Sequence, residues 1–136
     1  MGQASEEARH QIGQIEGVVL TGRVPDVRPY VAAGAVFIVP LHIGGGTRLK
    51  VLEAMAQGKA IVSTPVGCEG LDVVDGQHLL VAATPHAFAS AIVRLLADPA
   101  LRARLGASAR RLAVERYDWG SIAGELEQFY QELVCR

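Results

Sequence analysis

The stretch AVFIVPLHIGGGTRLKVLEAMAQG, residues 35–58, decides the fold class of this chain. Its first five residues form a continuous apolar run, which is typical of a strand buried on both faces of a parallel sheet. After three glycines, apolar residues recur at helical spacing from about Thr47 to Gln57, and Gly58 ends the helix. A buried strand, a glycine turn and a helix in this order predict one strand–helix unit of an α/β domain.

The rest of the chain repeats this alternation. Short apolar segments predict three further strands, at residues 18–20, 60–62 and 78–82. Threonine or aspartate caps and prolines at first turns predict the starts of several helices. Helices are expected over residues 3–14, after Asp26, after Thr84-Pro85, after Asp98-Pro99 and from Asp118. We therefore predict an α/β fold, with a Rossmann-like parallel sheet of four strands and flanking helices.

Length and composition fit a single globular domain over residues 1–136, with residues 1–16 as a polar lead-in. Hydrophobic residues make up 50% of the chain and charged residues 20%, which excludes a disordered chain. Thirteen basic against 14 acidic residues give a net charge of −1 and no basic stripe, so no nucleic-acid partner is expected. No apolar run approaches the roughly 18 residues of a membrane span and no secretory signal opens the chain, so we expect a cytoplasmic protein.

The predicted sheet looks incomplete. Four strands are few for a doubly wound domain, and the usual opening strand is absent. We expect the chain to be part of something larger, with an exposed sheet edge or apolar patch covered by self-association. Cys68 and Cys135 lack metal-site spacing and are interpreted as thiols, with a disulfide left open. No aspartate-rich metal motif is present, and no cofactor or metal is expected.

The glycine turn at residues 44–46 lies where the carboxyl end of a strand passes into a helix, which is where open α/β sheets bind ligands. Glycines allow a ligand to approach the backbone, and the helix N-terminus favours an anion. Arg48 adds a charged fork suited to a phosphate. The alternative is a tight turn without a ligand, because the stretch is neither a Walker A motif nor the dinucleotide fingerprint.

Glu53 is a carboxylate within an otherwise apolar helix. On a helical wheel it shares a stripe with Gly46, Lys50 and Gln57, so it faces the side of the glycine turn. A carboxylate there can accept hydrogen bonds from both hydroxyls of a ribose. The alternative is a solvated stripe with a Lys50–Glu53 surface pair that contributes about 0.2–0.5 kcal/mol.

The segment GGGTRLKVLEAMAQGKAIVSTPVGCEGL, residues 44–71, resembles the core of the glycosyl transferase group 1 family, whose members are retaining and have the GT-B fold. The upstream LTGRVPDVRPYVAAGAVFIVPL, the downstream VVDGQHLLVA and the late Tyr-Asp-Trp fit the family's order, so the resemblance covers roughly residues 17–134. It implies transfer of a glycosyl unit from a nucleotide-diphosphate sugar to a hydroxyl acceptor with retention. It also implies metal-independent chemistry.

The resemblance implies roles for individual residues. The family has two glutamates separated by seven residues; the second contacts the ribose and matches Glu53. The first contacts the donor sugar, and its position is occupied here by Gly45, so this sequence departs from the common pattern. The remaining expected donor-site residues are Gly46, Thr47, Arg48 and Leu49 around the diphosphate, and Arg23 and Val24 beside the base.

The resemblance also implies what this chain lacks. It corresponds to an incomplete nucleotide-sugar-binding C-terminal domain, without the N-terminal acceptor domain and without an upstream basic pair that holds the donor phosphates. No residue in it is assigned a certain catalytic role. Two alternatives stay open: a non-catalytic donor-binding subunit of a split glycosyltransferase, and a GT-B nucleotide-sugar epimerase. Peripheral membrane association of the full-length enzyme is a further open alternative.

Several other residues are interpreted as structural. Cys68 is expected to be a small buried residue. His42 and Glu69 lie on loops, with a place in the ligand site as the alternative reading of each. The aromatic residues at helical spacing near the C-terminus are expected to pack: Trp119, Phe129 and Tyr130. A basic helix face is expected to be solvated, with contact to anionic lipid or a partner as the alternative: Arg102, Arg104, Arg110 and Arg111.

Overall fold

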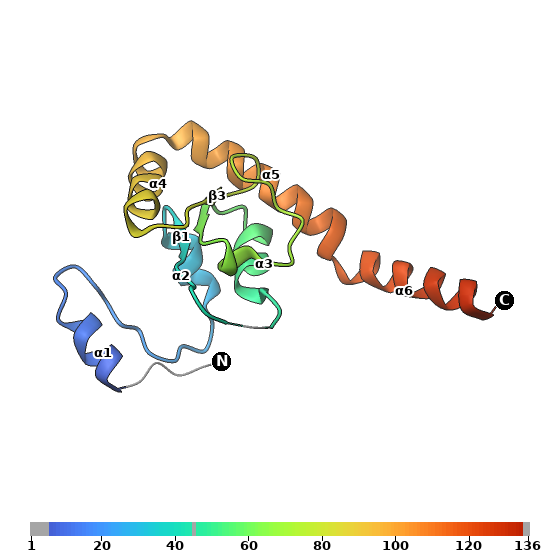
Figure 1. Cartoon of the computed structure of the whole chain (residues 1–136), viewed down its shortest axis with the longest axis horizontal. Helices are drawn as coiled ribbons and strands as arrows, with labels where there is room; N and C mark the ends of the chain where they lie inside the picture. Colours follow the sequence, from blue (N-terminus) through green and yellow to red (C-terminus); the bar gives the residue numbers. More distant parts are fainter. Residues whose placement is uncertain (1–5, 45, 135–136) are drawn as a thin grey trace.

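A three-stranded parallel sheet lies at the centre of the structure, a computed structural model that describes residues 6–44 and 46–134 (Figure 1). Its strands are β1 (Phe37–Val39), β2 (Ile61–Ser63) and β3 (Leu80–Val81), in the order β1-β2-β3. In register, Phe37 lies opposite Ile61, and Val62 lies opposite Leu80. The predicted α/β class with a parallel sheet is confirmed.

The predicted strand at residues 18–20 is wrong. All three residues are exposed and belong to no strand. A strand is held by hydrogen bonds to a neighbouring strand, and this segment follows α1 (Glu6–Gly13) to one side of the sheet (Figure 1). A short apolar run cannot form a strand where no partner strand lies beside it.

The helices start largely where the sequence predicts. They are α2 (Arg28–Ala33), α3 (Leu49–Ala56), α4 (Pro85–Ala97), α5 (Pro99–Tyr117) and α6 (Trp119–Val134), with a 3-10 turn η1 (Val66–Cys68) between β2 and β3. The Thr84 hydroxyl accepts a hydrogen bond from Ala87 N at 3.2 Å, and Asp98 accepts one from Leu101 N at 2.9 Å. Both predicted caps are confirmed. None of the described helices is long and apolar enough to span a membrane.

Asp26 does not cap α2 in the predicted way. The N-cap residue is Val27, which makes no side-chain cap bond. Asp26 instead binds Arg28, whose backbone N and side-chain Nε both donate to Oδ1, at 2.9 and 3.0 Å. The hydrogen bond from the Arg28 side chain, followed by that from its backbone, holds the pKa of Asp26 below its usual value. The Asp26 carboxylate therefore fixes the chain two residues before the first residue of α2.

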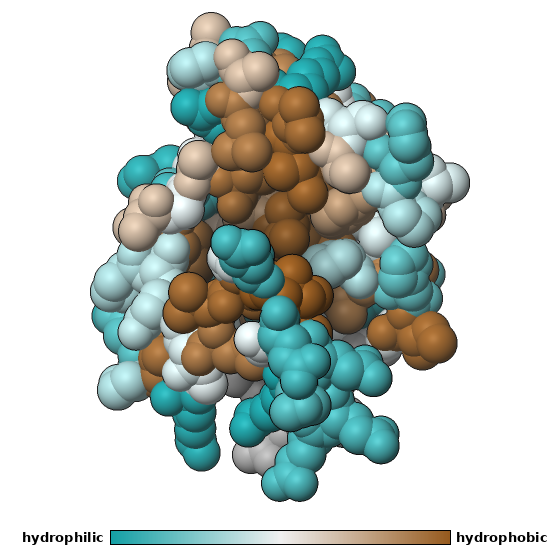
Figure 2. Space-filling view, turned by 90° about the vertical axis from the view of Figure 1, so that its left-hand side faces the viewer, coloured by the Kyte–Doolittle hydropathy of each residue, from teal (hydrophilic) through white to brown (hydrophobic). Residues whose placement is uncertain are grey.

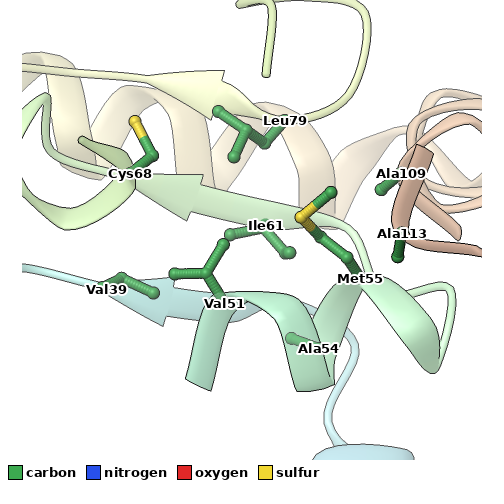
Figure 3. Close-up of a cluster of buried hydrophobic side chains, with 9 residues drawn as sticks. All are labelled: Val39, Val51, Ala54, Met55, Ile61, Cys68, Leu79, Ala109 and Ala113. Carbon is green, nitrogen blue, oxygen red and sulfur yellow. The ribbon is translucent and has the colours of Figure 1, made fainter. Parts of the chain in front are cut away.

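The two faces of the sheet carry separate apolar clusters, because successive side chains of a strand point to opposite faces. Ile61 of β2 faces α3, and the next residue, Val62, faces α4. The α3-side cluster, shown in Figure 3, consists of Val39, Val51, Ala54, Met55, Ile61, Cys68, Leu79, Ala109 and Ala113. The α4-side cluster consists of Ala60, Val62, Leu80, Leu95, Leu101 and Leu105. Cys68 is buried in the first cluster, as predicted.

Helix α5 contributes to both clusters and passes very close to the turn between α3 and β2. Its buried residues Leu101 and Leu105 join the α4-side cluster, and Ala109 and Ala113 join the α3-side cluster. Gly106 lies between them, where a β-carbon would overlap the carbonyl oxygen of Gly58. The absence of a side chain at residue 106 therefore sets how closely α5 approaches the sheet.

Lys59 connects the start of β2 to the end of α2. Its Nζ donates to the carbonyl oxygens of Ala32 at 2.6 Å and Gly34 at 2.9 Å. These carbonyls lie at the C-terminal end of α2, where helix carbonyls lack intrahelical partners and a cation is favoured.

Replacing Lys59 with methionine is expected to lower the free energy of unfolding by about 1.5–3 kcal/mol, because both hydrogen bonds to the ammonium group are lost. Urea denaturation followed by circular dichroism measures this change. Lys50→Met is the matched control, because Lys50 is exposed on α3 and makes no hydrogen bond within the described residues. Equal destabilisation by the two variants would contradict the role assigned to Lys59.

Helix α6 extends away from the rest of the molecule (Figure 1). None of its residues is buried, although it carries an apolar stripe. The expectation that Trp119, Phe129 and Tyr130 pack is wrong for this chain: all three are exposed, and Phe129 and Tyr130 only meet each other edge to face, with ring centroids 6.3 Å apart. The predicted amphipathic helix does form, but no element in the described part of the chain covers its apolar face.

Candidate functional site

A groove of about 540 Å³ lies beside the N-terminal end of α3. Its walls come from the first turns of α3, from the loop after η1 and from the junction of α5 and α6. The lining residues are Gly46, Thr47, Arg48, Leu49, Leu52, Glu53, Ala56, Glu69, Gly70, Leu71, Tyr117, Trp119 and Ile122. The groove therefore combines the residues that follow β1 with residues far along the chain.

The loop between β1 and α3 is fixed at the carboxyl end of the sheet by Thr64. The Thr64 hydroxyl donates to the carbonyl oxygen of Leu41 and accepts from Gly67 N at 3.1 Å. A β-carbon at Gly67 would lie 3.0 Å from the Val39 carbonyl oxygen and would overlap the Ser63 hydroxyl, so only glycine fits there. The loop that follows β1 and the turn that follows β2 are thereby held together.

Arg48 is the N-cap residue of α3, and its side chain is largely buried at the groove. Its Nη2 donates to the Gly44 carbonyl oxygen at 3.2 Å and to Glu69 Oε2 at 3.4 Å. The Arg48 side chain is 8% exposed, whereas that of Glu69 is 72% exposed. The Nε of Arg48 is buried without a hydrogen-bond partner among the residues that the structure describes. A fixed positive charge with one unsatisfied N–H therefore lies at the start of the helix.

Glu53 lies one turn further along α3, is exposed and lines the same groove. The surface pair with Lys50, offered as the alternative reading of Glu53, does not form. Within residues 6–44 and 46–134 the ion pairs are Arg28–Asp26 and Arg48–Glu69. Lys50 and Gln57, which share the helical stripe with Glu53, do not line the groove. The Glu53 carboxylate is thus available to a ligand.

The groove brings together many but not all of the predicted site residues. Those that line it are Gly46, Thr47, Arg48, Leu49 and Glu53. Arg23 and Val24 do not line it, and Gly45 lies outside the described residues. Cys135, predicted to be a thiol, also lies outside them.

The aromatic wall of the groove was not predicted from the sequence. The Tyr117 hydroxyl accepts a hydrogen bond from Asp72 N at 2.8 Å, which joins the end of α5 to the loop after η1. Trp119, at the start of α6, is 82% exposed and lies at the rim. The only signal in the sequence was the Tyr-Asp-Trp triplet at residues 117–119. The sequence predicted a helix start near Asp118, but it did not predict a contact between Tyr117 and residues 69–72.

His42 lies outside the groove, in a second cavity of about 270 Å³ against α4. Figure 2 shows the broad apolar surface on this side of the molecule. The cavity is lined mainly by apolar residues: Ile38, Pro40, Thr64, Ala82, Ala83, Thr84, Pro85, Phe88, Ala89 and Ile92, together with His42. His42 therefore does not line the groove beside α3, contrary to the alternative interpretation of this residue. Glu69 does line this groove, as its alternative interpretation proposed.

Only part of the basic face predicted on α5 is free of hydrogen bonds to other elements in the described part of the chain. Arg102 donates to the carbonyl oxygens of Leu95 and Leu96 at 2.6 and 2.8 Å, and so satisfies the C-terminal end of α4. Arg104 donates to Gly76 O at 3.4 Å. Two of the four arginines that the sequence assigns to solvent therefore hold neighbouring elements together.

The chemistry of the groove suits an anion joined to a polyol. The first N–H groups of a helix lack intrahelical partners and carry the positive end of the helix dipole. Arg48 adds a full charge at the same end, and Glu53 provides an acceptor for hydroxyl groups one turn away. In the described part of the chain, no group of three or more His, Cys, Asp or Glu residues is arranged to hold a metal ion.

Comparisons with known proteins show to which family the chain is similar. The chain is 32% identical over 124 residues to an uncharacterized glycosyltransferase of Methanocaldococcus jannaschii, a match that covers 87% of this chain and 31% of that protein. It is 33% identical over 132 residues to a phosphatidyl-myo-inositol mannosyltransferase of Mycobacterium leprae, covering 93% of this chain and 35% of the other. The chain thus spans about a third of the length of these relatives.

Solved structures show the same fold. The C-terminal domain of a group 1 family glycosyl transferase from Francisella tularensis matches with a TM-score of 0.69 at 22% identity, over 84% of this chain and 60% of that one. A sucrose-phosphate synthase from Thermosynechococcus elongatus matches with a TM-score of 0.68 at 31% identity, over 80% of this chain and 28% of that one. The family model described as glycosyl transferases group 1 matches residues 1–98. This chain belongs to the glycosyl transferase group 1 family.

Proposed function

We propose that the groove beside α3 binds the nucleoside diphosphate part of a nucleotide-sugar donor. The observation that carries this proposal is the placement of Arg48, the N-terminus of α3 and the unpaired Glu53 in one groove at the carboxyl end of the sheet. Family membership adds that the reaction is glycosyl transfer. We infer that the whole protein moves the sugar to a hydroxyl acceptor with retention, without a metal or other cofactor.

The diphosphate is proposed to lie against the first turn of α3. Backbone N–H groups at Thr47, Arg48 and Leu49 donate to its oxygens, and the Arg48 guanidinium balances its charge. Negative charge accumulates on the diphosphate as the bond to the sugar breaks, so fixed donors at this place stabilise the transition state electrostatically. The Glu53 carboxylate accepts from the ribose hydroxyls. The proposed contact of Arg23 and Val24 with the base requires the segment before β1 to approach the groove.

Acceptor recognition is proposed to come from outside this chain, because the chain spans about a third of its relatives. The uncovered apolar stripe of α6 is the surface expected to pack against that remainder. The apolar surface beside α4 is expected to be covered either in the same way or by self-association. The cytoplasm stays the predicted compartment.

Titration of the chain with UDP, GDP and ADP tests the proposal, with Trp119 as the reporter. Trp119 is the single tryptophan of the chain and lines the groove, so a ligand there changes its fluorescence. We expect a saturable change with one of the three nucleotides, together with a higher midpoint of thermal unfolding, since a ligand that binds only the folded state stabilises it. Inorganic phosphate at the same ionic strength is the control. No saturable change with any nucleotide and no thermal shift would contradict the proposal.

A further inference from the structure

Glu69 is a charged residue of the groove to which the proposed function assigns no role. It follows η1, and its carboxylate lies 3.4 Å from the Arg48 guanidinium through Oε2. The side chain is nevertheless 72% exposed, whereas the arginine is 8% exposed. The carboxylate is thus fixed at one oxygen by a buried cation and open to the groove elsewhere.

The position of Glu69 along the groove follows from the direction of Arg48. Glu53 lies one turn into α3, whereas the Arg48 guanidinium reaches back to the Gly44 carbonyl oxygen, before the helix begins. The groove therefore presents three groups in order: the Glu53 carboxylate, the N-terminus of α3, and the Arg48–Glu69 pair. A nucleotide sugar presents a ribose, a diphosphate and a sugar in the same order.

We propose that Glu69 recognises the sugar of the donor, an inference that rests on the proposed function of the groove. With the ribose at Glu53 and the diphosphate at the helix N-terminus, the sugar lies next to Glu69. A carboxylate accepts hydrogen bonds from neighbouring hydroxyls, and such charge-assisted bonds are stronger than neutral ones. Arg48 lies between the carboxylate and the diphosphate, so its positive charge offsets the repulsion between the two anions.

The test compares a sugar nucleotide with the corresponding nucleoside diphosphate on the 136-residue chain. Dissociation constants for UDP and UDP-glucose, and for GDP and GDP-mannose, are measured by calorimetry for the wild type, Glu69→Gln and Glu69→Asp. Glu16→Gln removes the same charge from an exposed residue outside the groove and is the matched control. Circular dichroism and the midpoint of thermal unfolding show that each variant is folded.

We expect Glu69→Gln to weaken binding of the sugar nucleotide about tenfold, the effect of losing one charge-assisted hydrogen bond. Binding of the nucleoside diphosphate should change less than about twofold, since it has no sugar to lose. Glu69→Asp, which keeps the charge on a shorter side chain, should give an intermediate loss for the sugar nucleotide alone. Glu16→Gln should change neither constant.

Other outcomes overturn the inference. An equal loss for both ligands in Glu69→Gln would mean that Glu69 acts only by holding Arg48 in place. Unchanged dissociation constants for both ligands in Glu69→Gln would exclude a contact between Glu69 and the sugar, while the proposed function stands. A wild-type chain that binds the nucleoside diphosphate but neither sugar nucleotide would leave a nucleotide site without a sugar contact, and would overturn the inference. A wild-type chain that binds neither ligand contradicts the proposed function itself, and the inference fails with it.

Discussion

Replacing Gly106 with alanine is expected to destabilise the chain by about 2 kcal/mol or more, as overpacking of a core typically costs about 1–3 kcal/mol. The new β-carbon would overlap the Gly58 carbonyl oxygen and lie 2.9 Å from the carbonyl carbon of the same residue. Both are backbone atoms, so no change of rotamer relieves the contact. Helix α5 would have to move away from the turn that joins α3 to β2.

The gain in helix propensity that opposes this destabilisation is smaller. Alanine is favoured over glycine within a helix by about 1 kcal/mol. A displacement of α5 would also loosen its contacts in both apolar clusters, because Leu105 and Ala109 lie on either side of Gly106. The loss of packing therefore outweighs the gain in helix propensity.

Urea denaturation of Gly106→Ala measures this effect, and Gly124→Ala provides a control of opposite sign. Gly124 lies within α6, where a β-carbon would meet no atom within 4 Å. Only the propensity effect remains there, so Gly124→Ala should be neutral or more stable by up to about 1 kcal/mol. A Gly106→Ala chain as stable as the wild type would show that α5 does not depend on this close approach.

Replacing Glu53 with alanine is expected to weaken nucleoside diphosphate binding by about 30- to 150-fold. Each hydrogen bond to a charged group contributes about 1.5–3 kcal/mol, and the two bonds to a ribose diol are not fully additive because the site is open to solvent. A total of about 2–3 kcal/mol corresponds to this range of affinity. Glu132→Ala, the same change on the exposed face of α6, should have no effect.

A double-mutant cycle assigns the loss at Glu53 to the ribose. UDP and 2′-deoxy-UDP, or the corresponding pair for the base that binds, are titrated against the wild type and Glu53→Ala. The wild type should discriminate between the two nucleotides, and the variant should not. Equal discrimination by both proteins would mean that Glu53 affects binding without touching the ribose.

The parts of the fold that depend on local sequence could be predicted. The caps Thr84 and Asp98 are correct because a cap bond joins residues only three apart. The start of α3 is two residues later than expected, since Arg48 has a non-helical ψ of 47° and Gly46 a φ of +96°. The prediction of a strand at residues 18–20 was wrong because a strand needs a neighbouring strand to pair with. A local sequence pattern does not show whether such a partner is present.

The same distinction applies to the candidate site. The residues from Gly46 to Glu53 could be predicted together because they lie on one turn and one helix. The contact between Arg48 and Glu69 joins residues 21 positions apart, and Tyr117 reaches Asp72 over 45 positions. The first pairing depends on where the loop after η1 lies beside the start of α3, and the second on where α5 ends. No spacing in the sequence specifies either position.

The measurement that tests the central claim most directly is nuclear magnetic resonance mapping of the bound nucleotide on the ¹⁵N-labelled chain. Binding at the groove predicts saturable amide shifts at Thr47–Glu53 and Glu69–Leu71, and on the Trp119 indole, with the residues lining the cavity against α4 unchanged. Shifts confined to that second cavity, or saturable binding that leaves the first turn of α3 unaffected, would contradict the assignment of the groove as the donor site.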